Sequence, residues 1–162
     1  MKSARFAEIL RLLATNDVEF IVVGMTAGVL HGAPVTTIDL DIVHRRSSEN
    51  VARLLRVLGE LDAFYRHDPR KLRPRDSHLG GPGHQLLTTI HGDLDCLGAI
   101  DDGKSYEDLL DRTTTITLAG GSVVRVLDLP TLIEIKERSG RPKDLAVLPV
   151  LRATLDEIER RS

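Results

Sequence analysis

Two short acidic segments carry the residues of this sequence that are best suited to chemistry. Asp39 and Asp41 alternate with apolar residues in 38–43 (IDLDIV), and Asp93 and Asp95 repeat the Asp-Leu-Asp pattern. Residues two apart in a β-strand lie on one face, with Cβ atoms roughly 6–7 Å apart. Carboxylate oxygens at this spacing suit a hard divalent cation such as Mg²⁺ or Mn²⁺. A solvated acidic edge is the alternative for either pair alone.

The repetition of the pattern favours a metal site over a solvated edge. A neighbouring strand that carries Asp95 would add a third carboxylate to Asp39 and Asp41. Such a group can hold one or two metal ions for phosphoryl transfer. We expect Asp95 rather than Asp93 to take part, because Asp93 directly follows a glycine at the expected turn and resembles a turn residue.

Several further motifs occur together in this chain. They are Gly24-Met25-Thr26-Ala27, His31-Gly32-Ala33-Pro34, Thr37-x-Asp39-x-Asp41, HGDLDCLG at 91–98, SYEDLL at 105–110, VRVLDLPTLIEIK at 124–136 and GRPKDL at 140–145. Their combination, over roughly residues 18–150, resembles the polymerase-beta-like nucleotidyltransferase superfamily. The nearest resemblance is to small bacterial nucleotidyltransferases related to the abortive-infection toxin group.

The resemblance implies transfer of a nucleoside monophosphate from an NTP to a hydroxyl group, with release of pyrophosphate. The acceptor would be an RNA, a protein or a small molecule. Asp39 and Asp41 would bind the Mg²⁺ that grips the triphosphate, and Asp95 would help to bind a second ion and activate the acceptor hydroxyl. Fixed cations offset the charge that moves onto the leaving phosphate. A metal-dependent phosphohydrolase with the same carboxylates is an alternative.

The same resemblance points to nucleotide-binding residues near the first strand. Gly24, Met25 and Thr37 match positions that meet the phosphates. The family usually has Gly or Ser where this chain has Met25, and many relatives have Arg where it has Val35. These two departures support a second hypothesis, a catalytically degenerate binding protein that acts with a cognate partner protein.

Lys136 is a further candidate, since it lies on or beside the apolar stripe of its helix. It would face the triphosphate, or it would be an amphipathic lysine that extends along the helix surface. Lys143 and Asp144 begin the next helix, and we expect a hydrogen bond between Asp144 and Lys136. Asp144 also complements the helix dipole, which is a sufficient structural reason for an acid there.

The expected elements predict an α+β fold, with a mixed, partly antiparallel sheet and helices mainly on one face. Strands are expected at 18–23, 38–43, 85–90 and 93–98, and helices at 25–31, 128–139 and 142–160. Residues 65–84 are expected to form a long loop with a short strand. Its basic residues, Arg66 among them, would contact phosphates or only keep the loop soluble.

Length and composition limit the other kinds of protein that this sequence could encode. A chain of 162 residues suits one domain, 1–162. Aromatic residues make up 3% and the net charge is −2, which argues against a base-stacking or generally basic nucleic-acid binder. The single cysteine, Cys96, suggests a reducing cytoplasm. We expect no membrane span, because no apolar stretch approaches about 20 residues.

Overall fold

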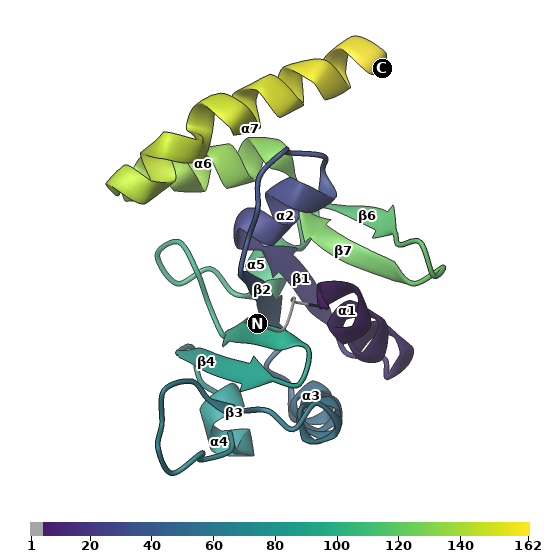
Figure 1. Cartoon of the computed structure of the whole chain (residues 1–162), viewed down its shortest axis with the longest axis vertical. Coiled ribbons are helices and arrows are strands. Elements are labelled where there is room, and N and C mark those ends of the chain that lie inside the picture. The colour runs from purple at the N-terminus through teal and green to yellow at the C-terminus, as the bar shows by residue number, and fades with distance from the viewer. Residues whose placement is uncertain (1–4) are drawn as a thin grey trace.

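The computed structural model describes residues 5–162, which form an α+β fold around one seven-stranded sheet with the strand order β3-β4-β5-β2-β1-β7-β6 (Figure 1). The strands are β1 (Phe20–Val23), β2 (Asp39–His44), β3 (Phe64–Tyr65), β4 (His84–Thr89), β5 (Gly92–Leu97), β6 (Thr113–Thr117) and β7 (Val123–Leu127). The helices are α1 (Phe6–Thr15), α2 (Gly24–Leu30), α3 (Ser48–Glu60), α4 (Asp76–Leu79), α5 (Tyr106–Leu109), α6 (Leu129–Ser139) and α7 (Pro142–Arg161), with a 3₁₀ turn at Leu110–Arg112.

The two acidic segments lie on neighbouring strands at the centre of the sheet. β2 pairs with β1 in antiparallel fashion and with β5 in parallel fashion. The register places Asp41 opposite Asp95, and Val23 opposite Asp41 on the other side. The sheet therefore joins residues that are more than fifty positions apart in the sequence.

Alternation along β2 and β5 separates an apolar face from an acidic one. Leu40, Ile42 and Cys96 are completely buried on the side away from the carboxylates, as the sequence pattern predicts. A strand over 38–43 would place Ile38 on this buried face as well, and that prediction is wrong, because Ile38 is 77% exposed. The reason is that β2 begins at Asp39, so Ile38 belongs to the preceding loop.

Helices α6 and α7 lie side by side at one end of the molecule, while β3, β4 and α4 lie at the other (Figure 1). α2 packs closely on this helical pair. A Cβ added at Gly28 would meet Leu151 Cδ2 at 3.0 Å and Leu132 Cδ2 at 3.6 Å. Because α2 follows β1 directly, this packing places α6 near the end of β1 that pairs with Asp41.

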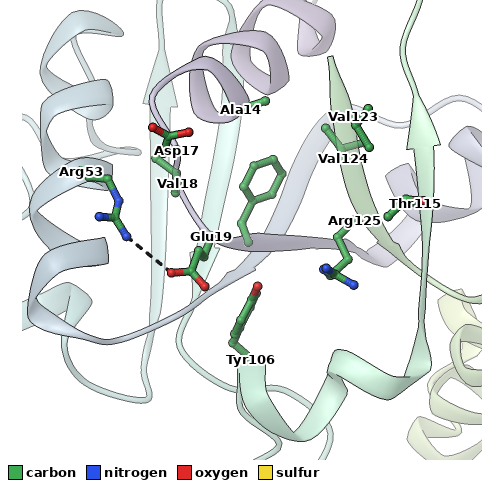
Figure 2. Close-up of a pocket in the computed structure, with 11 residues that line it drawn as sticks. Ala14, Asp17, Val18, Glu19, Arg53, Tyr106, Thr115, Val123, Val124 and Arg125 are labelled. Atoms are coloured by element: carbon green, nitrogen blue, oxygen red, sulfur yellow. Dashed lines mark hydrogen bonds and ion pairs between the residues drawn. The ribbon is translucent and has the colours of Figure 1, made fainter. Parts of the chain in front are cut away.

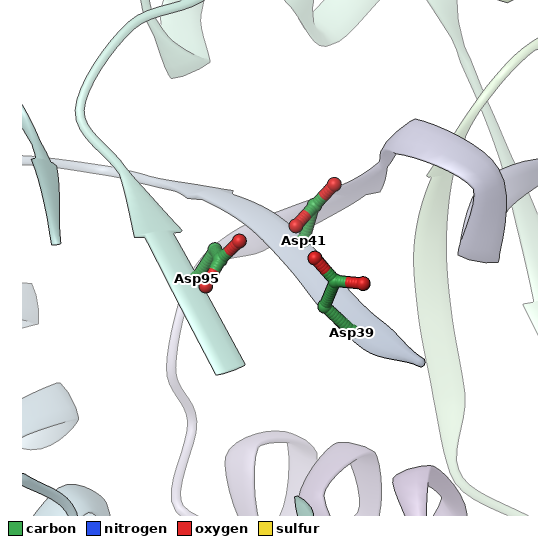
Figure 3. A group of neighbouring side chains, drawn as sticks. All are labelled: Asp39, Asp41 and Asp95. Atoms are coloured by element: carbon green, nitrogen blue, oxygen red, sulfur yellow. The ribbon is translucent and has the colours of Figure 1, made fainter. Parts of the chain in front are cut away.

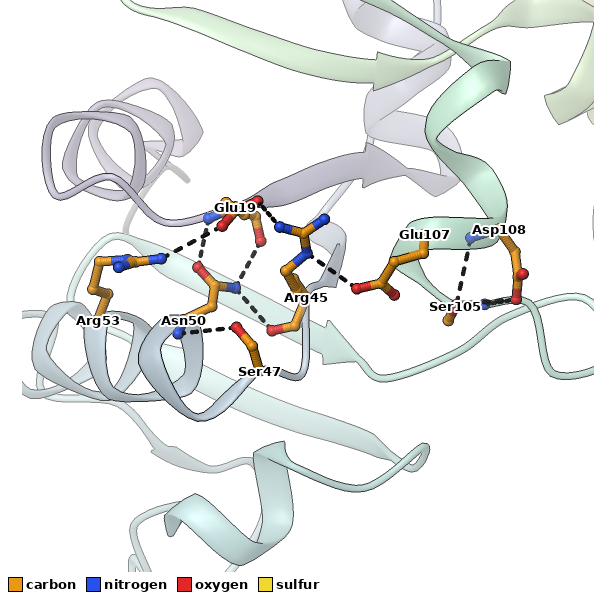
Figure 4. Close-up of polar contacts among 8 residues, drawn as sticks. All are labelled: Glu19, Arg45, Ser47, Asn50, Arg53, Ser105, Glu107 and Asp108. Carbon is orange, nitrogen blue, oxygen red and sulfur yellow. Dashed lines mark hydrogen bonds and ion pairs between the residues drawn. The ribbon is translucent and has the colours of Figure 1, made fainter.

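A polar network fixes the opposite end of β1 and β2 (Figure 4). Asn50 is completely buried; its side chain accepts from the Glu19 N–H at 2.7 Å and donates to the carbonyls of Glu19 and Arg45. Arg45 in turn pairs with Glu19 at 2.6 Å and with Glu107 at 3.0 Å. The network thus joins α3 and α5 to the central strands.

The segment at 65–84 was expected to form a long loop with a short strand, and the structure adds a short helix that was not expected. It contains the end of β3 and the one-turn helix α4, which places the buried Leu79 in the core. A single turn carries too little periodicity to be recognised from the sequence. Over residues 5–162, every helix is too short or too polar to cross a membrane.

Candidate active site

Three carboxylates converge on the acidic face of β2 and β5 (Figure 3). One oxygen from each of Asp39, Asp41 and Asp95 lies within 4.8 Å of the others. Asp95 is 7% exposed, and the other two are half-buried. The converging group contains Asp95 and not Asp93, which lies near the start of β5 with its Oδ2 3.2 Å from Arg66 Nε.

The turn between β1 and α2 leaves space for Asp41. Gly24 has φ +64°, a left-handed conformation that glycine adopts easily. A Cβ at Gly24 would lie 2.3 Å from Asp41 Oδ2, which is far inside van der Waals contact. Glycine is therefore needed here for its backbone conformation and for its lack of a side chain.

Asp41 is held in an environment that disfavours its charge. Burial, followed by the hydrogen bond and charge of Asp95 and the charge of Asp39, raises the pKa of Asp41 to about 7, and Lys136 partly opposes this. Asp41 Oδ1 is buried and has no hydrogen-bond partner within residues 5–162. An unpartnered buried carboxylate oxygen beside two further carboxylates fits a hard divalent cation. The donor set is thus suited to Mg²⁺ or Mn²⁺.

Asp41 and Asp95 line a cavity of about 470 Å³ that continues toward α6. Gly24, Lys136 and Arg141 line the same cavity. Anionic and cationic groups therefore line the same cavity, which is large enough for a small ligand.

Lys136 is oriented by a buried acid at the start of α7. Its Nζ donates to Asp144 Oδ1 at 2.9 Å, which confirms the expected hydrogen bond. Ser139 and Arg141 donate to Asp144 Oδ2 at 2.5 and 2.9 Å. Burial acts to raise the pKa of Asp144, but the bonds from Ser139, Lys136 and Arg141 outweigh it and hold this pKa at about 2. Asp144 therefore remains ionised and fixes two cations at the cavity.

The other predicted binding residues take different positions. The hydroxyls of Thr37 and Thr26 both donate to the Asp39 carbonyl, at 3.1 and 3.0 Å, so Thr37 supports β2. Met25 and Val35 pack against the hydrophobic core. Lys143 is exposed on the first turn of α7.

Two ion pairs near the cavity could not be recognised from the sequence. Arg66 pairs with Asp95, and Arg138 pairs with Asp101. Asp101 and Arg138 both line the cavity. Each pair joins residues from separate segments, so no local spacing marks it.

A second cavity of about 510 Å³ lies at the other end of β1 and β7 (Figure 2). Phe20, Tyr106 and Arg125 line it, and Arg53 pairs there with Glu19 at 3.5 Å. The three converging carboxylates lie outside it, which favours the first cavity as the candidate active site.

Solved structures share this fold, although their sequences are distant. The lincosamide antibiotic adenylyltransferase LnuA, with bound lincomycin, has a TM-score of 0.64 at 15% identity, and the match covers 95% of this chain and 99% of that one. ANT(2'')-Ia in complex with adenylyl-2''-tobramycin has a TM-score of 0.59 at 15% identity, with 95% and 90% covered. The candidate nucleotidyltransferase TM1012 from Thermotoga maritima has a TM-score of 0.57 at 20% identity, with 94% and 91% covered.

These likenesses define a class by fold: the chain has a nucleotidyltransferase fold, and its acidic cluster is consistent with a divalent metal site. No protein-family model matches the sequence, and no curated protein matches it significantly. The likeness at 14–20% identity concerns the fold, and the activity of this chain has to be argued from its own residues.

Proposed function

We propose that this protein is a Mg²⁺-dependent nucleotidyltransferase that transfers a nucleoside monophosphate from an NTP to a hydroxyl group of an acceptor. The observation that carries the proposal is the convergence of Asp39, Asp41 and Asp95 within 4.8 Å on one sheet face. Asp41 and Asp95 share their cavity with Lys136, so a site for cations adjoins a site for phosphates.

Asp39 and Asp41 would hold the cation, which when bound offsets negative charge on the triphosphate and on the leaving pyrophosphate. Lys136 presents its ammonium group to the triphosphate, because Asp144 keeps the lysine in place. Gly24 lies beside Asp41, and Gly24 and Met25 begin α2, so their backbone N–H groups would be available to the phosphates.

Thr37 holds the carbonyl of Asp39, and Lys143 adds an exposed cation at the start of α7. These two residues would support binding from the edge of the site rather than contact the reacting atoms.

The reaction needs a group that accepts a proton. The acceptor hydroxyl oxygen bonds to the α-phosphorus, the bond from that phosphorus to the bridging oxygen breaks, and pyrophosphate leaves with the electron pair. Asp95 lies beside Asp41 and would take the hydroxyl proton. This role suits a carboxylate held at a fixed position next to the reacting phosphate.

The packing of Met25 favours catalysis over the degenerate alternative. A bulky side chain in the cavity would obstruct the phosphates, but Met25 packs against the core, and its Cε lies 3.5 Å from the position of a Cβ at Gly28. Val35 also packs against the core. The two departures from the family pattern therefore leave the acidic cluster unobstructed.

The proposal is tested first by binding. Isothermal titration with Mg²⁺ and each NTP should give binding to the native chain and strongly reduced binding to Asp39→Asn and Asp41→Asn. Asp156→Asn, which changes an exposed acid of α7, is the matched control and should behave as the native chain. Equal binding by all variants, or none by any, would contradict the proposal.

Transfer is tested with α-labelled NTPs and separate fractions of RNA, protein and small molecules. Label should enter one fraction and depend on Asp41. Release of free nucleotide without a labelled acceptor would indicate a phosphohydrolase instead. We also propose, from the motifs, a relation to the abortive-infection toxin group; expression of the native chain should then arrest growth, and expression of Asp41→Asn should not.

A further inference from the structure

One arginine reaches the third carboxylate from outside the acidic cluster. Arg66 follows β3 directly, and its Nη2 lies 2.5 Å from Asp95 Oδ1. Its Nε lies 3.2 Å from Asp93 Oδ2, so a single guanidinium pairs with both acids of the second Asp-Leu-Asp segment. The Arg66 side chain is 18% exposed, which limits screening of these ion pairs by water.

Arg66 is itself fixed at two points. Its backbone N–H donates to the Leu86 carbonyl at 3.0 Å, and its Nη2 donates to the Leu87 carbonyl at 2.9 Å. Both acceptors belong to β4, which pairs with β5. The planar guanidinium thus has a defined position relative to Asp95, unlike a solvated arginine on a loop.

The contact with Arg66 gives the two carboxylate oxygens of Asp95 different surroundings. Oδ1 is taken by Arg66, and one carboxylate oxygen of Asp95 points toward Asp41 in Figure 3. At most one oxygen of Asp95 therefore remains for the cation and the acceptor hydroxyl, and the positive charge of Arg66 lowers the attraction of the cluster for that cation.

We propose that Arg66 is a positioning residue for Asp95: it holds one oxygen of this carboxylate toward the cation and competes with the cation for the other. The inference rests on the proposed function, because it assigns a regulator of cation affinity to the same site. Its consequence is a cation that binds moderately without nucleotide and firmly only when the triphosphate adds its own oxygens.

The test measures Mn²⁺ alone, by electron paramagnetic resonance titration of the full chain. Arg66→Gln should bind Mn²⁺ about five- to tenfold more tightly than the native chain, the scale set by removing a unit charge close to a partly solvated site. Arg66→Lys keeps the charge and should stay within about twofold. Circular dichroism checks that each variant is folded, and Arg66→Met, which also removes the charge and should tighten Mn²⁺ binding to the same extent, takes the place of Arg66→Gln if that variant does not fold.

A matched control comes from the same loop. Arg70 has a side chain that is 76% exposed and pairs with Asp68 at 3.3 Å. Arg70→Gln removes the same charge at a solvated position, and Mn²⁺ affinity should change less than twofold.

A double-mutant cycle shows whether Arg66 acts through Asp95. In an Asp95→Asn background, Arg66→Gln should change Mn²⁺ affinity much less than in the native chain, because the carboxylate for which they compete is gone. Unchanged or weaker Mn²⁺ binding by Arg66→Gln in the native background would overturn the inference. So would an equal effect in both backgrounds.

Failure of the inference differs from failure of the proposed function. If Mn²⁺ binds the native chain and Asp41→Asn abolishes this binding while Arg66→Gln changes nothing, only the role of Arg66 is wrong. If the native chain binds no Mn²⁺, both proposals are overturned.

Discussion

Asp144 offers the strongest test of how the cavity is held together. Its side chain is 4% exposed and receives hydrogen bonds from Lys136, Ser139 and Arg141. Together these partners lower the pKa of Asp144 from 3.8 to about 2. A carboxylate whose pKa is lower in the native state stabilises that state at neutral pH.

The size of this contribution follows from the pKa. One pKa unit corresponds to about 1.4 kcal/mol, so the ionised Asp144 contributes about 2 kcal/mol to the free energy of unfolding. The contribution is fully present above the unfolded pKa, near 4, and is lost as pH falls through about 2. At pH 3 about half of it should remain.

Urea denaturation of the native chain and Asp144→Asn measures this effect. At pH 7 the variant should be less stable by about 2 kcal/mol, and the difference should narrow toward pH 3. Asp156→Asn changes an exposed acid on the same helix and should cost less than about 0.5 kcal/mol at either pH. A difference for Asp144→Asn that does not vary with pH would refute the reasoning.

A double-mutant cycle tests whether Lys136 and Asp144 stabilise the protein as a pair. Lys136→Ala and Asp144→Ala should show coupled losses of stability, with an interaction energy of about 1 kcal/mol or more, because Lys136→Ala leaves Asp144 Oδ1 without its cation and Asp144→Ala leaves the Lys136 ammonium group without its carboxylate. Additive losses of stability would mean that Asp144 stabilises the fold through Arg141 or through α7, independently of Lys136.

Three further outcomes are expected. Gly24→Ala should weaken Mn²⁺ binding at least about tenfold through the clash with Asp41. Gly140→Ala is the control for backbone strain, because Gly140 has φ +62° and open space around it. Equal Mn²⁺ affinities of the Gly24→Ala and Gly140→Ala variants would contradict the clash. Because the pKa of Asp41 is raised to about 7, the protein without divalent cations should lose thermal stability as pH rises from about 4 to 7. Adding Mg²⁺ at pH 8 should restore this thermal stability. In thermal melts, Asp41→Asn should make the melting temperature much less dependent on pH. Cys96→Ser places a hydroxyl at a completely buried position and should cost about 1–3 kcal/mol in urea unfolding, whereas a cost near zero would mean that water reaches Cys96.

Local pattern was enough to locate the strands of the site and the faces of their side chains. Alternation in Asp39–His44 and Gly92–Leu97 is a property of the extended chain, so the acidic and buried faces of β2 and β5 were predictable. The Lys136–Asp144 bond was also predictable, because a short connection joins the two helices. Ile38 shows the limit, since alternation cannot tell where a strand begins.

The amino-acid sequence alone established two Asp-Leu-Asp strands, a helical lysine with an acid eight positions later, and an aliphatic α+β chain. It could not establish that β2 and β5 are neighbours in parallel register, that Gly24 clears Asp41 Oδ2, or that Arg66 reaches Asp95 rather than a phosphate. The physical reason is the distance along the sequence over which the deciding interactions act. Strand and helix patterns follow from interactions over a few residues, whereas the charge and spacing of this cluster come from segments that meet only when the sheet forms.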